Sequence, residues 1–242
     1  MATEQTGQTE TNDDGSMSLI AHLEELRRRL IRSLIAVAVG SAIAYFFIED
    51  IMHWLTAPAG KLYYLQPAEA FFTYLKVAVA TGFLLALPVV FYHVWRFFLP
   101  ALTVKERMVL GLLVPLSVLL FFGGLAFSFY AVLPFVVKFF MGFGNSELEA
   151  MFSIDKYFDF IVTFVLPFGF MFELPLVLAV LAKMGFVTSQ GLKKYFRYVI
   201  FISFVVAAML TPPDVVSQTM LAIPLIALYG VGYGVVRFLL KK

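Results

Sequence analysis

The chain contains no cysteine among its 242 residues, which excludes disulfides, thiolate catalysis and cysteine-based metal sites. Charged residues are also scarce, at 14% of the chain, whereas 61% of the residues are hydrophobic. Soluble domains are usually about 45–50% apolar by the same kind of count, and a chain this apolar cannot cover a water-facing surface with polar groups. The composition predicts an integral membrane protein.

Motifs for catalysis and for nucleotides are missing as well. There is no HExxH zinc motif, no GxSxG with a usable histidine, and no glycine-rich phosphate loop. The three histidines, His22, His53 and His93, all stand near the ends of apolar segments. We therefore expect no enzyme activity, no cofactor and no metal. The basic loops are short and adjoin the membrane, which argues against nucleic acid as a partner.

Continuous apolar runs predict an all-α polytopic membrane protein, because a bilayer core of about 30 Å takes about 20 apolar residues per helix. The runs do not alternate, which argues against a barrel. The six expected spans are about 31–48, 71–95, 108–132, 157–182, 195–210 and 215–236. The fifth reaches only about 24 Å before Thr211-Pro212-Pro213, so the last two helices should be short on one side. Prolines in or near several spans predict a curved bundle.

The first thirty residues precede the first expected span. Residues 1–16 are small, polar and acidic, which is typical of a disordered tail. Residues 17–30 place leucine and isoleucine at spacings of three and four and predict a short amphipathic helix lying in the interface. Residues 17–242 are then a single transmembrane domain.

Basic residues set the orientation. Of the 18 lysines and arginines, the larger group falls on one side of the expected spans: Arg27, Arg28, Arg29, Arg32, Arg96, Lys105, Arg107, Lys183, Lys193, Lys194, Arg197, Arg237, Lys241 and Lys242. That side should be cytoplasmic, with both termini inside. Trp54 and Trp95 are expected to anchor the chain at the membrane interfaces.

Glu173 is the most informative single residue, since it lies deep in the fourth expected span. A carboxyl group at that depth is costly and usually faces a cavity, a partner or a proton pathway. The alternative is a neutral, hydrogen-bonded glutamic acid used in packing. Gln218, one turn into the sixth span, is also polar at a costly depth, and Asp214 before it suits a helix N-cap.

Two further glutamates adjoin the membrane on the basic side. Glu25 stands four residues before Arg29, a spacing typical of a surface salt bridge. Glu106 completes the capping box Thr103-x-x-Glu106 at the start of the third span. Each carboxylate is also suited to a bidentate pair with a guanidinium. Chemistry alone favours the salt bridge for Glu25 and leaves both readings open for Glu106.

Several motifs in order resemble the TatC family, whose members form the core of the twin-arginine protein translocase. The resemblance covers nearly the whole chain after residue 17. The motifs are His22-Leu23-Glu24-Glu25-Leu26-Arg27, Tyr92 to Pro100 with Glu106-Arg107, Phe172-Glu173-Leu174-Pro175, Leu210 to Gln218, and Leu221-Ala222-Ile223-Pro224.

The resemblance implies a receptor for folded proteins that carry twin-arginine signal peptides, driven by the proton-motive force. Glu25 and Glu106 would receive the two guanidiniums, with Arg27 and Phe97 in the same surface. Glu173 and Gln218 would form an intramembrane polar site for the single-span partners TatB and TatA, in an oligomeric complex of the inner (plasma) membrane. Further positions that match the family motifs are Pro58, Pro100 and Asp214.

Three other functions compete with this interpretation. A proton-coupled small-solute transporter would use Glu173 as its proton carrier, but it should have ionisable groups in other spans too. An intramembrane enzyme lacks a nucleophile and base. A passive scaffold would tolerate neutralisation of Glu25 or Glu106.

Overall fold

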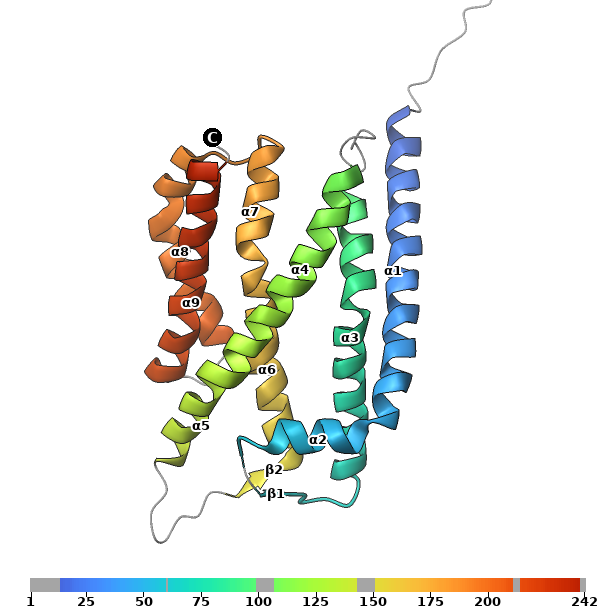
Figure 1. Cartoon of the computed structure of the whole chain (residues 1–242), viewed down its shortest axis with the longest axis vertical. Coiled ribbons are helices and arrows are strands. Elements are labelled where there is room, and N and C mark those ends of the chain that lie inside the picture. Colours follow the sequence, from blue (N-terminus) through green and yellow to red (C-terminus); the bar gives the residue numbers. More distant parts are fainter. Residues whose placement is uncertain (1–13, 60, 99–106, 143–150, 211–213, 240–242) are drawn as a thin grey trace, which may run out of the picture.

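The computed structural model describes residues 14–59, 61–98, 107–142, 151–210 and 214–239. Most of them are helical (Figure 1). The long elements are α1 (Asp14–Phe46), α3 (Glu69–Phe98), α4 (Arg107–Phe127), α6 (Ile154–Phe172), α7 (Leu174–Lys183), α8 (Ser189–Leu210) and α9 (Val215–Gly234). The shorter elements are α2 (Ile48–Thr56), the π-helical turns η1 (Ser128–Val132) and η2 (Val235–Leu239), α5 (Leu133–Met141), and the strands β1 (Leu62–Tyr63) and β2 (Phe152–Ser153).

Five helical stretches are long and apolar enough to cross a membrane, which confirms an all-α polytopic membrane protein. They are Ile20–Phe46, Glu69–Phe98, Gly111–Met141, Ile154–Lys183 and Val215–Phe238. The fifth expected span corresponds to α8, which has 22 residues but carries three cations in its first half. It begins at Ser189 rather than near residue 195, after Thr188, whose hydroxyl oxygen accepts a hydrogen bond from the Gly191 N–H.

The two ends of the bundle differ. α1 begins and α9 ends at the upper end in Figure 1, as expected if both termini lie on one side. At the lower end α2 lies across the bundle, and α8 and α9 stop short of its level (Figure 1). The expectation that the last two helices are short on one side therefore agrees with their 22 and 20 residues, against 33 for α1.

The N-terminal region differs from the expectation. The predicted interfacial helix at 17–30 is not a separate element, because α1 runs unbroken from Asp14 through the first span to Phe46. No proline occurs in this stretch and its first glycine after Gly15 is Gly40, so nothing interrupts the ladder of backbone hydrogen bonds. Of the expected tail, residues 1–13 lie outside the described residues.

Two other spans carry irregularities where the sequence has proline. The third continues to Met141 instead of ending near residue 132, because the wide turn η1 and Pro134 in the first turn of α5 are accommodated without a break. The fourth is interrupted between α6 and α7, since Pro175 in the first turn of α7 has no N–H to donate. Glu173 is the single residue at this interruption.

α4 crosses α6 at close range (Figure 1). A Cβ atom on Gly169 would lie 2.7 Å from the ring of Phe121, and Gly124 faces the backbone of Phe168. Small residues let the backbones of membrane helices approach in this way. The largest buried cluster lies beside this crossing and joins α5, α6, α8 and α9, with Leu133, Phe164 and Leu221 fully buried.

A polar network closes the lower end. β1 and β2 form a parallel pair with Leu62 opposite Phe152, and the Glu69 carboxylate joins the two loops. It accepts hydrogen bonds from the N–H groups of Leu65 (2.6 Å) and Gln66 (3.1 Å) and from the Ser153 hydroxyl. It also accepts one from the N–H of Asp155, and the Asp155 side chain pairs with Nζ of Lys76 at 2.6 Å.

Replacing Glu69 by glutamine should lower the thermal midpoint of the purified chain by a few degrees, because the amide nitrogen that replaces one carboxylate oxygen cannot accept the two hydrogen bonds that this oxygen now accepts. Glu49→Gln is the matched control, since Glu49 is exposed on α2 and has no hydrogen-bond partner among the described residues. Thermal unfolding in detergent, followed by tryptophan fluorescence, measures both. Equal shifts for the two variants would refute a special role for Glu69.

Candidate functional site

The site begins with the contact between α1 and α3, which lie side by side and antiparallel (Figure 1). Gly40 and Gly82 face one another: a Cβ atom on Gly40 would lie 2.6 Å from the Gly82 carbonyl oxygen, and one on Gly82 would overlap the backbone of Ser41. The Ser41 hydroxyl donates to the Val37 carbonyl at 2.8 Å, within its own helix. This contact fixes the lower part of α1 against the middle of α3.

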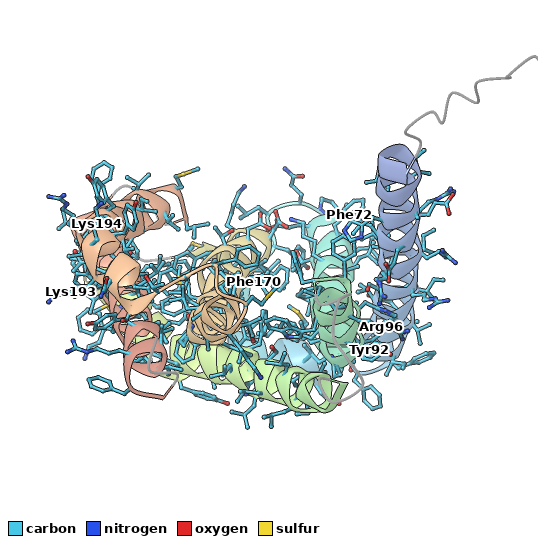
Figure 2. The ribbon with its side chains drawn as sticks, turned by 90° about the horizontal axis from the view of Figure 1, so that it is seen from above. Phe72, Tyr92, Arg96, Phe170, Lys193 and Lys194 are labelled. Atoms are coloured by element: carbon cyan, nitrogen blue, oxygen red, sulfur yellow. The ribbon has the colours of Figure 1, made fainter. Side chains whose placement is uncertain are left out.

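At the upper end of this helix pair, α1 and α3 meet through an aromatic stack. The ring centroids of His22 and Phe97 are 4.4 Å apart, with an angle of 18° between the planes. Arg96, which directly precedes Phe97, donates to the Tyr92 hydroxyl at 2.6 Å, and Arg96 and Tyr92 lie at the edge of the bundle near α1 (Figure 2). His22 had no role in the sequence interpretation, although it opens a motif that did.

Glu25 lies one turn after His22, on the same face of α1. Its Oε1 accepts a hydrogen bond from Nε of Arg29 at 3.0 Å and forms an ion pair with the same guanidinium. The expected i,i+4 pair is therefore confirmed. Oε2 has no partner among the described residues, and the Glu25 side chain is 35% exposed. One carboxylate oxygen is thus available to a further donor.

The other residues expected in this surface are placed differently. Arg27 is exposed, and it points to another side of α1 than Glu25, because residues two apart on a helix do not share a face. Phe97 contacts His22 instead. Glu106 and Pro100 lie outside the described residues; in the sequence, Glu106 directly precedes Arg107, the first residue of α4.

Glu173 stands at the interruption between α6 and α7 and is 7% exposed. Neither of its carboxyl oxygens has a hydrogen-bond partner among the described residues. The Ser117 hydroxyl of α4 adjoins the carboxyl group without hydrogen-bond geometry. Within the described residues the carboxyl is therefore buried without a hydrogen-bond partner, an arrangement that is costly in a membrane protein.

Trp95 also contacts Ser117, and its position differs from the expected one at the membrane interface. It is not an interfacial anchor, because it is 7% exposed and its Nε1 donates to Ser117 Oγ at 2.8 Å. Burying an indole requires a partner for its N–H, and Ser117 supplies one. By contrast, Trp54 is 49% exposed at the lower end, where the expectation of an anchor remains a prediction.

Gln218 does not join Glu173. Its Nε2 donates to the Phe204 carbonyl of α8 at 3.0 Å. The residue of α9 that packs near Glu173 is Gly232, since a Cβ atom on Gly232 would lie 3.2 Å from Cα of Pro175, two residues after Glu173. From Gln218 to Gly232 the helix rises about 21 Å. The two polar residues therefore occupy separate sites, which the sequence alone did not reveal.

The two remaining expected positions lie at the lower end. Asp214 is the N-cap of α9, since its Oδ1 accepts a hydrogen bond from the Ser217 N–H at 2.8 Å. Pro58 lines an apolar pocket of about 460 Å³ together with Trp54, Tyr130 and Lys138. Neither residue contacts the upper surface.

Comparison with known proteins agrees with these features. A family model described as Sec-independent protein translocase protein (TatC) matches residues 21–224. The chain is 46% identical over 228 residues to the TatC protein of Desulforapulum autotrophicum, covering 91% of this chain and 84% of the relative. It is 42% identical to that of Synechocystis, covering 96% and 92%.

A solved structure gives the same result for the fold. The crystal structure of a twin-arginine translocase receptor, TatC, superposes with a TM-score of 0.81 at 39% identity, covering 91% of this chain and 100% of that chain. Family model, relatives and structure thus agree over almost the whole molecule. The chain belongs to the TatC family of Sec-independent protein translocases, which are protein-transport subunits and not enzymes.

Proposed function

We propose that this chain is the signal-peptide receptor and core subunit of a twin-arginine translocase, and that it exports folded proteins with the proton-motive force. The observation that carries the proposal is the Glu25 carboxylate, which α1 holds at the upper end, one turn from the His22 ring that stacks on Phe97, with no partner for Oε2 among the described residues. Family membership supports the same function.

Recognition of an arginine pair follows from the shape of guanidinium. Its planar fork donates two parallel hydrogen bonds to a carboxylate, which the single ammonium of lysine cannot do. Glu25 would receive one arginine through Oε2, and Glu106, in the segment between α3 and α4, would receive the other. Arg27, which is exposed on another side of α1, would stand outside this carboxylate surface, and Phe97 would offer the peptide an apolar contact.

The upper end faces the cytoplasm in this proposal. Cytoplasmic loops of membrane proteins carry an excess of lysine and arginine, and the upper end holds the described basic residues of α1, α8 and η2. The chain would then cross the inner (plasma) membrane six times, with α8 as the additional span and both termini inside.

Single-span TatA and TatB subunits would bind within the membrane, in an oligomeric complex. The buried, unsatisfied carboxyl of Glu173 would receive a polar group from one partner helix. The region around Gln218, where α8 ends and α9 begins above the level of α2, would be a second contact for a partner helix. The two sites are about 21 Å apart along the bundle, which is within the length of about 30 Å of one membrane-spanning helix.

A proton-coupled solute transporter remains the second candidate, favoured by the buried Glu173 carboxyl alone. The two functions differ in what Glu173→Gln should do. If Glu173 is a partner site, the Glu173→Gln variant should still bind a twin-arginine signal peptide. Its export of a folded reporter should fall severalfold, because the amide presents different hydrogen-bonding groups to the partner.

The measurement is export in cells whose own TatC is replaced by the variant, together with peptide binding to the purified chain. Ser203→Ala is the control: Ser203 is also buried, but it donates to the Val199 carbonyl of its own helix. Normal export by Glu173→Gln would remove the partner role. If the unmodified chain failed to support export in cells whose own TatC it replaces, that result would contradict the proposed function itself.

A further inference from the structure

The upper part of α8 presents a concentrated positive charge to the outside of the bundle. Lys193, Lys194 and Arg197 are all exposed, and the two lysines lie at the outer edge of the molecule, away from α1 and α3 (Figure 2). After Glu173 the sequence has one acidic residue, Asp214, at the opposite end of the bundle. No carboxylate of α7, α8, α9 or η2 neutralises these cations.

A fourth cation reaches the same end from η2. Leu192 of α8 and Val236 of η2 belong to one buried cluster, and the Tyr229 hydroxyl donates to the Leu192 carbonyl at 3.0 Å. These contacts hold the start of α8 against the end of α9. Lys193 and Arg237, which follow Leu192 and Val236 in the sequence, are therefore on adjoining elements.

Aromatic rings lie beside the cations and are exposed at the surface of the protein. The Arg197 guanidinium lies 5.1 Å from the ring centre of Tyr198, and that of Arg237 lies 5.4 Å from Phe238. These two rings are 51% and 69% exposed. Exposed aromatic residues next to lysine and arginine are typical of the headgroup level of a membrane, which favours a lipid over a soluble acidic peptide.

An apolar strip continues from the cations along the same side of α8. Lys194, Arg197, Phe201, Val205 and Met209 follow one another at spacings of three and four residues, which places them on one side of the helix. Phe201 is 69% exposed, Val205 42% and Met209 80%. A cationic head above an exposed apolar strip is complementary to an amphiphile with an anionic headgroup and acyl chains parallel to the helix.

We infer that this face of α8 binds an anionic phospholipid of the leaflet at the upper end. The phosphate lies against Lys193, Lys194 and Arg197, and the acyl chains lie along Phe201 and Val205. The site is separate from the Glu25 surface, which is on the other side of the bundle (Figure 2). It does not depend on the signal-peptide function.

The test is retention of phosphatidylglycerol by the purified full chain, measured by native mass spectrometry against phosphatidylcholine. The triple variant Lys193→Gln/Lys194→Gln/Arg197→Gln should lose at least about tenfold in apparent affinity for phosphatidylglycerol, since each cation near an anionic lipid surface contributes about a fivefold factor. Its affinity for phosphatidylcholine should not change. Phe201→Ala, which keeps every charge, should weaken phosphatidylglycerol binding too.

The matched control is Lys61→Gln/Lys138→Gln/Lys156→Gln, which removes the same charge from exposed lysines at the lower end and should retain the lipid. Elution as a single species on size exclusion confirms that each variant is folded. Equal retention by the two triple variants would overturn the site. So would displacement of the lipid by inorganic phosphate at millimolar concentration, which would reveal an anion site without acyl-chain contacts.

Discussion

Gly82→Ala should leave little folded protein in the membrane. The added Cβ would fall on the backbone of Ser41 in α1, and a backbone cannot rotate away as the end of a side chain can. Overpacking of a core usually costs about 1–3 kcal/mol, and here the two helices themselves must separate. We expect a severalfold loss of purified chain and a clearly lower thermal midpoint for what remains.

The same substitution should also impair the upper surface. α1 reaches α3 near its upper end through the stack of His22 on Phe97, so a displaced α1 would carry Glu25 away from α3. Gly123→Ala is the control, because a Cβ atom there meets nothing within 4 Å, and alanine is the better helix former by about 1 kcal/mol. Equal yields and midpoints for the two variants would contradict the close contact.

Neutralising both glutamates should abolish most binding of a twin-arginine signal peptide. In Glu25→Gln/Glu106→Gln, each amide has one accepting oxygen instead of two, supplies no charge and cannot form the bidentate pair with a guanidinium. We expect each single variant to weaken binding by about tenfold and the double variant to lose more than either. Anisotropy of a labelled signal peptide with the purified chain measures this.

Glu24→Gln is the matched control for that experiment, since it makes the same change one residue away. Glu24 is exposed on α1, and neighbouring residues on a helix do not share a face. It should bind the peptide as the unmodified chain does. If Glu24→Gln weakened binding as much as Glu25→Gln, the effect would come from net charge at the upper end and not from a placed carboxylate.

Features that depend on one stretch of sequence were predictable. The apolar runs located the membrane helices, and the i,i+4 spacing gave the pair of Glu25 with Arg29. Asp214 after two prolines indicated the N-cap that α9 has. In each case the partners are within a few residues of one another, so local geometry decides the outcome.

Features that depend on contacts between helices were not predictable from the sequence by itself. Trp95 has the pattern of an interfacial tryptophan, but Ser117 on another helix makes its burial possible. Glu173 and Gln218 are both polar residues in apolar spans, yet packing of α9 on α7 and α8 assigns them to different levels. The sequence also does not show that Gly82 must lack a side chain, because the reason is its contact with Ser41 on another helix.

The most direct test of the receptor function compares two peptides on the unmodified chain. A signal peptide with its arginine pair and the same peptide with two lysines carry equal charge and differ in the planar fork. We predict that the purified chain binds the arginine peptide at least about tenfold more tightly. Equal affinity for the two peptides would mean that the upper surface reads charge alone, and would contradict recognition of the arginine pair.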